Sequence, residues 1–401
     1  MHGSAHSWHP LPPGRPHGAI LKQQASALPI AAIVVGGLIT ALLAAAMTMA
    51  PPGLLLVAVP LLVGVLVLGV WFYTWLDRWE PEPPHFLFAA FLWGAGVSIL
   101  VAGILNTIVL LSTESMFVTA VVAAPLTEES MKGIFLVLLL LGRRGRAEFN
   151  SRVDAIVYAG FIGMGFTFIE DMTYILEMGS VGEGIAVGIA RTVSGTFLHA
   201  IFTTITALGI WRAVTSRAAT GWLWAVAGWL GAVSLHALFN LVVGFPGWGF
   251  WAGTAISIGA TLYIVQLGIA SKRQEQAVLH HQLPVLVSHG WISGNEAGWL
   301  ADKPARKQAI ESAKRRGRQE AKLLADFIQN VTELCFIRDR LDARNPGPYP
   351  QEWIDNHAML VGLVSLQRPV VDAVLGSGRW APLPPQSGRG YGAGLPGRSG
   401  D

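Results

Sequence analysis

Charged residues and cysteine are both scarce in this sequence of 401 residues. Charged side chains make up 13% of the chain and hydrophobic ones 52%, whereas a soluble domain carries about 25% charged residues. The mean hydropathy is +0.48. The single cysteine, Cys335, excludes an intramolecular disulfide and a cysteine metal cluster. These values predict a membrane protein, and its 15 tryptophans suit the two membrane interfaces.

Several common motifs are also missing. The sequence contains no His-Glu-x-x-His motif, no Gly-x-Ser-x-Gly motif and no Ser-Lys arrangement, so it is neither a zincin nor a common serine protease. It has no phosphate-binding glycine loop and no recognisable nucleic-acid module, so we expect no nucleic-acid partner. We also expect no cleavable signal peptide, because the first apolar run, 28–50, exceeds an h-region of about 7–15 residues.

Long apolar runs dominate what is present. Each is near or above the roughly 20 residues that cross a bilayer. We therefore predict an all-α fold, a polytopic transmembrane helix bundle of about eight spans with a small helical cytoplasmic C-terminal appendage. The expected spans are 28–50, 54–76, 85–111, 116–142, 153–176, 185–214, 221–244 and 248–270.

The composition predicts four regions. They are a disordered cytoplasmic tail at 1–27, an eight-helix membrane domain at 28–270, a helical cytoplasmic region at 271–376 and a disordered Gly/Pro-rich tail at 377–401. Within the third region, Asp302 followed by Pro304 predicts a helix start.

Basic residues predict the orientation in the membrane. Lys and Arg gather at 143–152, at 212–217 and at 272–273, whereas the connections between them lack both residue types. Because cytoplasmic loops carry the excess of Lys and Arg, we expect these segments and both termini in the cytoplasm. The expected location is the bacterial cytoplasmic membrane.

Two adjacent carboxylates interrupt the fourth apolar run. Glu128 and Glu129 lie inside a predicted span, where a charged residue costs about 2.5–3.5 kcal/mol and usually faces a cavity. Lys132 lies three residues after Glu129, so the two share a helix face and can pair. Such a group is a functional-site candidate, and the alternative is a buried ion pair that only fixes packing.

Further polar residues follow in the next three spans. Glu170 is followed by Asp171, His199 lies in the sixth span, and His236 and Asn240 share a face of the seventh because they are four residues apart. Each residue alone is more typical of a helix end or a packing contact. Together they supply a general base, orienting groups and oxyanion donors, and they also resemble metal ligands.

At these residues the sequence resembles the PrsW family of intramembrane proteases, within a wider group that includes CAAX prenyl endopeptidases and bacteriocin-processing relatives. The matching stretches are 77–83, 91–95, 124–132, 154–174, 199–209 and 236–240. They occur in order and cover most of 70–245. One departure is Asp171, where the family usually has Asn.

The resemblance implies an intramembrane endopeptidase of glutamic type, in which Glu128 or Glu129 activates a water. His236 and Asn240 would place the water or hold the oxyanion, and His199 and Glu170 would complete the site. It also implies regulated proteolysis of a single-pass membrane protein, such as an anti-sigma factor, by a site-1-type cut near the outer face. No cofactor is expected, with a divalent metal as the alternative.

Two other functions stay open. A non-enzymatic transporter or scaffold would also place carboxylates near the membrane midplane, although we find no inverted repeat. A CAAX-type prenyl peptidase usually has Glu-Glu-x-x-x-Arg, whereas here Lys132 comes one residue earlier.

Overall fold

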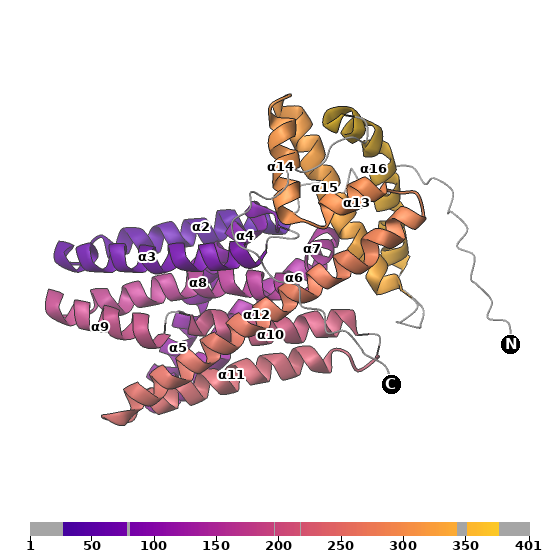
Figure 1. Ribbon diagram of the computed structural model, residues 1–401. Coiled ribbons are helices and arrows are strands. Elements are labelled where there is room, and N and C mark those ends of the chain that lie inside the picture. Colours follow the sequence, from indigo (N-terminus) through magenta and orange to yellow (C-terminus); the bar gives the residue numbers. More distant parts are fainter. Residues whose placement is uncertain (1–26, 78–80, 196, 217, 343–350, 377–401) are drawn as a thin grey trace, which may run out of the picture. The chain divides into compact units, whose positions relative to one another are not determined.

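The computed structural model describes residues 27–77, 81–195, 197–216, 218–342 and 351–376. Throughout these ranges the regular elements are helices and no strand occurs, which confirms the predicted all-α bundle (Figure 1). The chain divides into two compact units, the described residues up to Glu275 and those from Gln276 onward. Apart from Ala27, the predicted disordered tails 1–27 and 377–401 lie outside the described residues, and the four-region division stays a prediction.

The first unit is built from long apolar helices in succession. They are α2 (Ala27–Met47), α3 (Pro52–Leu76), α4 (Pro84–Leu92), η1 (Trp93–Ser98), α5 (Ile99–Thr113), η2 (Val118–Ala123), α6 (Ala124–Leu141), α7 (Arg143–Glu148), α8 (Arg152–Leu176), α9 (Val181–Gly195), α10 (Leu198–Thr215), α11 (Leu223–Val243) and the first part of α12 (Trp248–Ser288). The elements η1 and η2 are π-helical turns that continue directly into α5 and α6.

Eight helices in the described chain are long and apolar enough to cross a membrane, which agrees with the predicted number. Seven coincide with predicted spans. The predicted span 116–142 is helical and is formed by η2 and α6. It is not among the eight apolar helices because Glu128, Glu129 and Lys132 interrupt it. The eighth candidate is Trp353–Leu375, a stretch that we expected in the cytoplasmic appendage.

The predicted span 185–214 is two helices in succession rather than one. Phe197 precedes α10 with backbone angles of φ −107° and ψ 2°, which are not helical. Figure 1 shows α9 and α10 following one another along the bundle. As a result, His199 is the second residue of a new helix instead of the middle of a long one.

Helix α8 is the most buried helix of this unit. It contacts α3, α4, η1, α9 and α10. Gly163 permits one of these contacts, because a Cβ there would come within 2.3 Å of the Ala200 Cα atom. This close approach brings the start of α10 against the middle of α8.

The connection after α3 carries two buried carboxylates, one near each end. Asp77 and Glu82 are each 5% exposed. The Glu82 backbone N–H donates to Asp77 Oδ2 at 2.7 Å, and the Tyr158 hydroxyl donates to Glu82 Oε2 at 2.5 Å. Burial raises the pKa of Asp77 to about 9, and it also raises the pKa of Glu82 well above its usual range.

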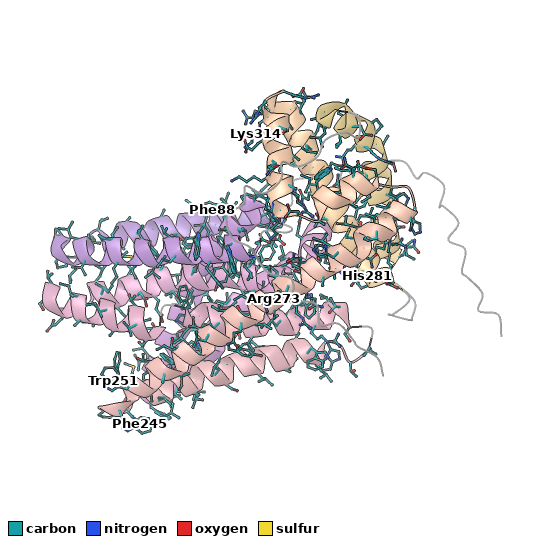
Figure 2. All side chains as sticks on the ribbon, in the orientation of Figure 1. Phe88, Phe245, Trp251, Arg273, His281 and Lys314 are labelled. Atoms are coloured by element: carbon teal, nitrogen blue, oxygen red, sulfur yellow. The ribbon has the colours of Figure 1, made fainter. Side chains whose placement is uncertain are left out.

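Aromatic and basic residues mark opposite ends of the part of α12 within this unit. Figure 2 shows Phe245 and Trp251 close together at one end of the helix pair α11 and α12, and Arg273 far along α12. Phe245 also stacks on Trp248, with ring centroids 5.1 Å apart. This arrangement is typical of a span between an aromatic interface and a basic one, while the orientation stays a prediction.

The second unit contains the end of α12 with α13 (Gly294–Leu300), α14 (Lys303–Lys314), α15 (Arg318–Leu341) and α16 (Gln351–Leu375). The Asp302 side chain accepts from the Ala305 backbone N–H, so the predicted helix start is confirmed. Helix α16 packs against α15 and α14. Cys335 is a buried free thiol, and burial raises its pKa to about 12.

Candidate active site

The centre of the candidate site is the start of α6. Glu129 and Lys132 are completely buried, and Lys132 Nζ donates to Glu129 Oε1 at 2.7 Å. The same ammonium group lies 4.3 Å from the centroid of the Phe166 ring. The predicted pair therefore forms, and an aromatic face covers its cation.

Two indole groups hold this part of α6 in place. Trp93 Nε1 donates to the Met131 carbonyl at 2.8 Å, and Trp229 Nε1 donates to Ser130 Oγ at 3.1 Å. These contacts come from η1 and α11, so both neighbours fix the rotation of the helix that carries the carboxylates.

His236 reaches the same carboxylate from α11. Its Nδ1 atom lies 3.0 Å from Glu129 Oε1, and its ring stacks on Phe202 with centroids 4.8 Å apart. Because a carboxylate only accepts, Nδ1 carries the hydrogen. In the neutral ring, Nε2 is then an acceptor, and it lies 3.9 Å from Glu128 Oε2.

His199 reaches the site from the start of α10. Its Nδ1 atom lies 2.9 Å from Lys132 Nζ, and its Nε2 atom lies 2.8 Å from Glu170 Oε2. An ammonium group only donates, so Nδ1 accepts and Nε2 carries the hydrogen toward Glu170. These partners assign the tautomer of His199.

Glu128 has a different environment from Glu129. Its Oε1 atom accepts a long bond of 3.5 Å from Asn106, whereas Oε2 is buried and has no hydrogen-bond partner among the described residues. That oxygen lies 3.9 Å from both His199 Nδ1 and His236 Nε2. Such gaps exceed a hydrogen bond, and one bridging water could close either of them. Glu129 Oε2 is also unpartnered in the described chain, but Glu129 Oε1 already binds Lys132 and His236.

The Asn240 amide makes its hydrogen bond to the backbone rather than to this cluster. Its Nδ2 atom donates to the Ala120 carbonyl in η2 at 2.8 Å. In a π-helical turn the donor to this carbonyl would be the residue five positions later, Pro125, which has no N–H, so the Asn240 amide takes its place. The structure thus gathers five of the six predicted site residues, Glu128, Glu129, Glu170, His199 and His236.

Sequence reasoning missed two polar residues at the site. Arg191 of α9 forms ion pairs with Glu170 and Asp171. Asn106 of α5 contacts Glu128 and also accepts from the Thr127 hydroxyl at 2.8 Å. Both interrupt apolar runs, and that interruption is the signal that could have identified them.

Three of these side chains could in principle hold a metal ion. Ligand atoms of Glu128, His199 and His236 lie within 4.8 Å of one another. Two imidazoles and a carboxylate suit catalytic zinc, and each imidazole has a carboxylate on its other nitrogen, as metal-bound histidines usually do. However, Lys132 Nζ donates to His199 Nδ1, the nitrogen that would bind the ion. With this cation in place, the residues do not fit a resident divalent metal.

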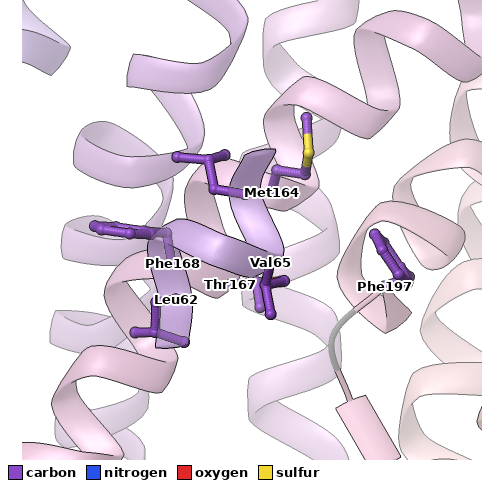
Figure 3. A pocket seen from close by; sticks show the side chains of 7 residues that line it. Leu62, Val65, Met164, Thr167, Phe168 and Phe197 are labelled. Carbon is purple, nitrogen blue, oxygen red and sulfur yellow. The ribbon is translucent and has the colours of Figure 1, made fainter. Parts of the chain in front are cut away.

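An apolar pocket lies beside the charged cluster. Figure 3 shows Met164, Thr167 and Phe168 of α8, Leu62 and Val65 of α3, and Phe197 around it. None of its lining residues is charged. Thr167 is its one polar lining residue, and it lies one helical turn before Glu170.

Comparisons with known proteins match the first unit, which we call the membrane unit. Residues 82–268 match the family described as PrsW family intramembrane metalloprotease. The chain is 31% identical over 153 residues to Protease PrsW of Clostridioides difficile, covering 37% of this chain and 60% of that protein. The resemblance to the PrsW family is confirmed. Protease PrsW of Geobacillus kaustophilus is 26% identical over 196 residues. This match covers 47% of this chain and 80% of that protein.

A third relative, Protease PrsW of Bacillus subtilis, is 26% identical over 153 residues, covering 37% of this chain and 65% of that protein. The first of these relatives is thus matched over less than two thirds of its length. No solved structure matches the chain significantly. The five residues that cluster at the candidate site all lie within the matched residues 82–268. The second compact unit lies outside this range.

Proposed function

We propose that this protein is an intramembrane endopeptidase of glutamic type, in which Glu128 activates the attacking water. One observation carries the choice of base. Glu128 Oε2 is buried, lacks a partner among the described residues and faces two imidazole nitrogens at 3.9 Å. Glu129 is instead engaged by Lys132 and His236, which suits an orienting role.

The proposed reaction uses a water between Glu128 Oε2 and His236 Nε2. Glu128 accepts a proton from this water. At the same time, the water oxygen attacks the carbonyl carbon of the scissile peptide bond. When the tetrahedral intermediate collapses, Glu128 returns the proton to the leaving amine nitrogen. Glu129 holds the His236 ring in the orientation that places its Nε2 lone pair on the water.

The depth of Glu128 supports cleavage inside the bilayer. At about 1.5 Å per residue, Glu128 is about 15 Å from Val118 and about 20 Å from Leu141 along the helix. It is therefore nearer the end of the span that the basic loops predict to be outside. A single-pass membrane regulator, such as an anti-sigma factor, is the substrate class that we propose, with both termini of the protease in the cytoplasm.

The test is cleavage of a synthetic transmembrane peptide by the full-length protein in phosphatidylcholine vesicles. The peptide has about 20 apolar residues, with a fluorophore at one end and a quencher at the other. Gly and Ser near one end of the apolar stretch weaken its helix. We expect Glu128→Gln to insert normally and to lose about 10²–10⁴-fold in rate. Glu183→Gln, the same change at an exposed position of α9, is the matched control.

Mass spectrometry of the products locates the cut, which we expect within the apolar stretch. Wild-type rates in Glu128→Gln at wild-type stability would contradict the proposed base. If the wild-type protein cleaves no transmembrane peptide, the site returns to the packing or transport alternatives.

A further inference from the structure

Arg191 of α9 connects two carboxylates of α8. Its Nη2 atom donates to Glu170 Oε2 at 2.5 Å, and its Nε atom donates to Asp171 Oδ1. The guanidinium carbon also lies 3.9 Å from the centroid of the Tyr174 ring. We propose that Arg191 is a positioning residue, which fixes the direction and the tautomer of His199 through Glu170. The proposal rests on the proposed function for its catalytic consequence.

The rest of α9 gives Arg191 a defined place. Gly184 and Gly188 of this helix pack against α3 and α8, where a Cβ at either would come within 2.8 Å of a leucine side chain of α3 and within 3.5 Å of Ile175 of α8. The opposite face, including Ile189 and Val193, is exposed. A helix seated by small residues approaches its neighbour closely, so the arginine fork reaches the carboxylates from the packed side.

One oxygen atom carries the link from Arg191 to the site. Glu170 Oε2 accepts from Arg191 Nη2 and also from His199 Nε2 at 2.8 Å. A guanidinium group is a rigid planar donor, so its two charge-assisted bonds limit rotation of the Glu170 carboxylate. The direction of the His199 N–H bond follows from the position of that oxygen.

The consequence appears on the other side of the imidazole ring. With its hydrogen held on Nε2 by Glu170, His199 presents the Nδ1 lone pair to Lys132 and toward Glu128. If Glu170 could rotate freely, the hydrogen could move to Nδ1, and Nδ1 would then lose the ammonium contact. Arg191 thus acts on the reacting groups through two intervening side chains.

Asp171 offers a way to distinguish two roles of Arg191. Arg191 either positions Glu170 or only compensates the charge of Asp171. Asp171 is 2% exposed and needs a cation or its own proton in that environment. If Arg191 only compensates Asp171, then Asp171→Asn makes Arg191 dispensable. If Arg191 positions Glu170, its loss stays harmful whether position 171 carries a charge or not.

The first measurement is the tautomer of His199 by nitrogen-15 NMR of histidine-labelled full-length protein in detergent micelles. The His199 signals are assigned by their loss in His199→Gln. We expect wild type and Asp171→Asn to show one neutral tautomer with the hydrogen on Nε2. Arg191→Gln should show the two ring nitrogens averaging between tautomers, while the His236 signals, set by Glu129, stay unchanged. An unchanged His199 spectrum in Arg191→Gln at wild-type stability would overturn the proposal.

Two further variants keep the test decisive if Arg191→Gln misfolds. They are Arg191→Lys and the double variant Arg191→Gln/Asp171→Asn. The first keeps the charge without the planar fork, and the second removes one charge of each sign. We expect an intermediate His199 spectrum in the lysine variant and an averaged one in the double variant. A wild-type spectrum in the double variant would assign Arg191 to charge compensation alone.

Peptide cleavage in vesicles is the second measurement. A misplacement of 1 Å costs about 10²-fold in rate, so Arg191→Gln should lower kcat by about that factor with KM unchanged. The double variant should recover stability without recovering kcat, and full recovery of kcat would contradict the positioning role. If wild type cleaves no peptide, the proposed function fails, while the NMR result still decides the structural link.

Discussion

The first unit contains two groups of carboxylates that are buried or half-buried, and their partners differ. Near the middle of the bundle, Glu129 contacts the ammonium group of Lys132, and Glu170 contacts the guanidinium group of Arg191. At the end of α3, Asp77 instead accepts from a backbone N–H, and Glu82 accepts from a phenol hydroxyl.

The difference separates carboxylates that orient histidines from carboxylates that join chain segments. A pKa of about 9 keeps the Asp77 carboxyl protonated at neutral pH, where it acts as a hydrogen-bonding contact between chain segments. A carboxylate beside a fixed cation stays available to orient a histidine. The same substitution should therefore cost more stability in the first group than in the second.

The largest expected effect is at Lys132. Lys132→Met leaves Glu129 without its cation, and breaking a buried pair costs about 3–5 kcal/mol of unfolding free energy. Denaturant unfolding in detergent measures the loss. The matched control is Lys314→Met, which removes an exposed pair of the same spacing, with Nζ 2.8 Å from Glu311 Oε1, and should change stability little.

Lys132→Met should also free His199 Nδ1 for a metal ion. We expect the purified variant to bind zinc with Glu128, His199 and His236 as ligands, whereas wild type does not. Equal zinc content in both proteins would show that Lys132 does not compete with a metal.

A smaller effect should distinguish Glu129→Gln from Glu82→Gln. The first leaves Lys132 without a charged partner, and we expect a loss of about 3 kcal/mol. The second replaces a protonated carboxyl with an amide that can still accept from Tyr158, so we expect a change below about 1 kcal/mol. Unfolding of both variants in one detergent checks the ranking, and a larger loss for Glu82→Gln would reverse the comparison.

The last effect is a pH dependence of stability from Asp77, which is small when it is measured over one pH unit. Its pKa is raised to about 9 in the folded protein, so the unfolded chain releases this proton at lower pH than the folded one. The contribution to stability is complete below about pH 4 and is lost as pH rises toward 9, by at most about 1.4 kcal/mol per pH unit.

Asp77→Asn should flatten this part of the pH profile, because the amide does not titrate. The neighbouring carboxylates that also raise the Asp77 pKa are Asp154, Glu275 and Glu148. An unchanged slope in the variant would assign the pH dependence to them.

The sequence predicted most of the site because ionisable residues stand out against apolar runs. Glu128, Glu129, His199 and His236 were visible for that reason, and helical spacing paired Glu129 with Lys132. Arg191 was missed because the span around it was treated as one apolar helix, whereas the structure has α9 and α10. Asn240 shares a helix face with His236, but the π-helical turn that engages it has no signal in an apolar run.

We propose above that a carboxylate, and not a metal, activates the water. The direct test is peptide cleavage by wild-type protein before and after dialysis against a chelator, with metal content measured by mass spectrometry in the same samples. We expect an unchanged cleavage rate in protein that contains far less than one equivalent of any divalent metal. Loss of cleavage on chelation, restored by one equivalent of zinc, would contradict it.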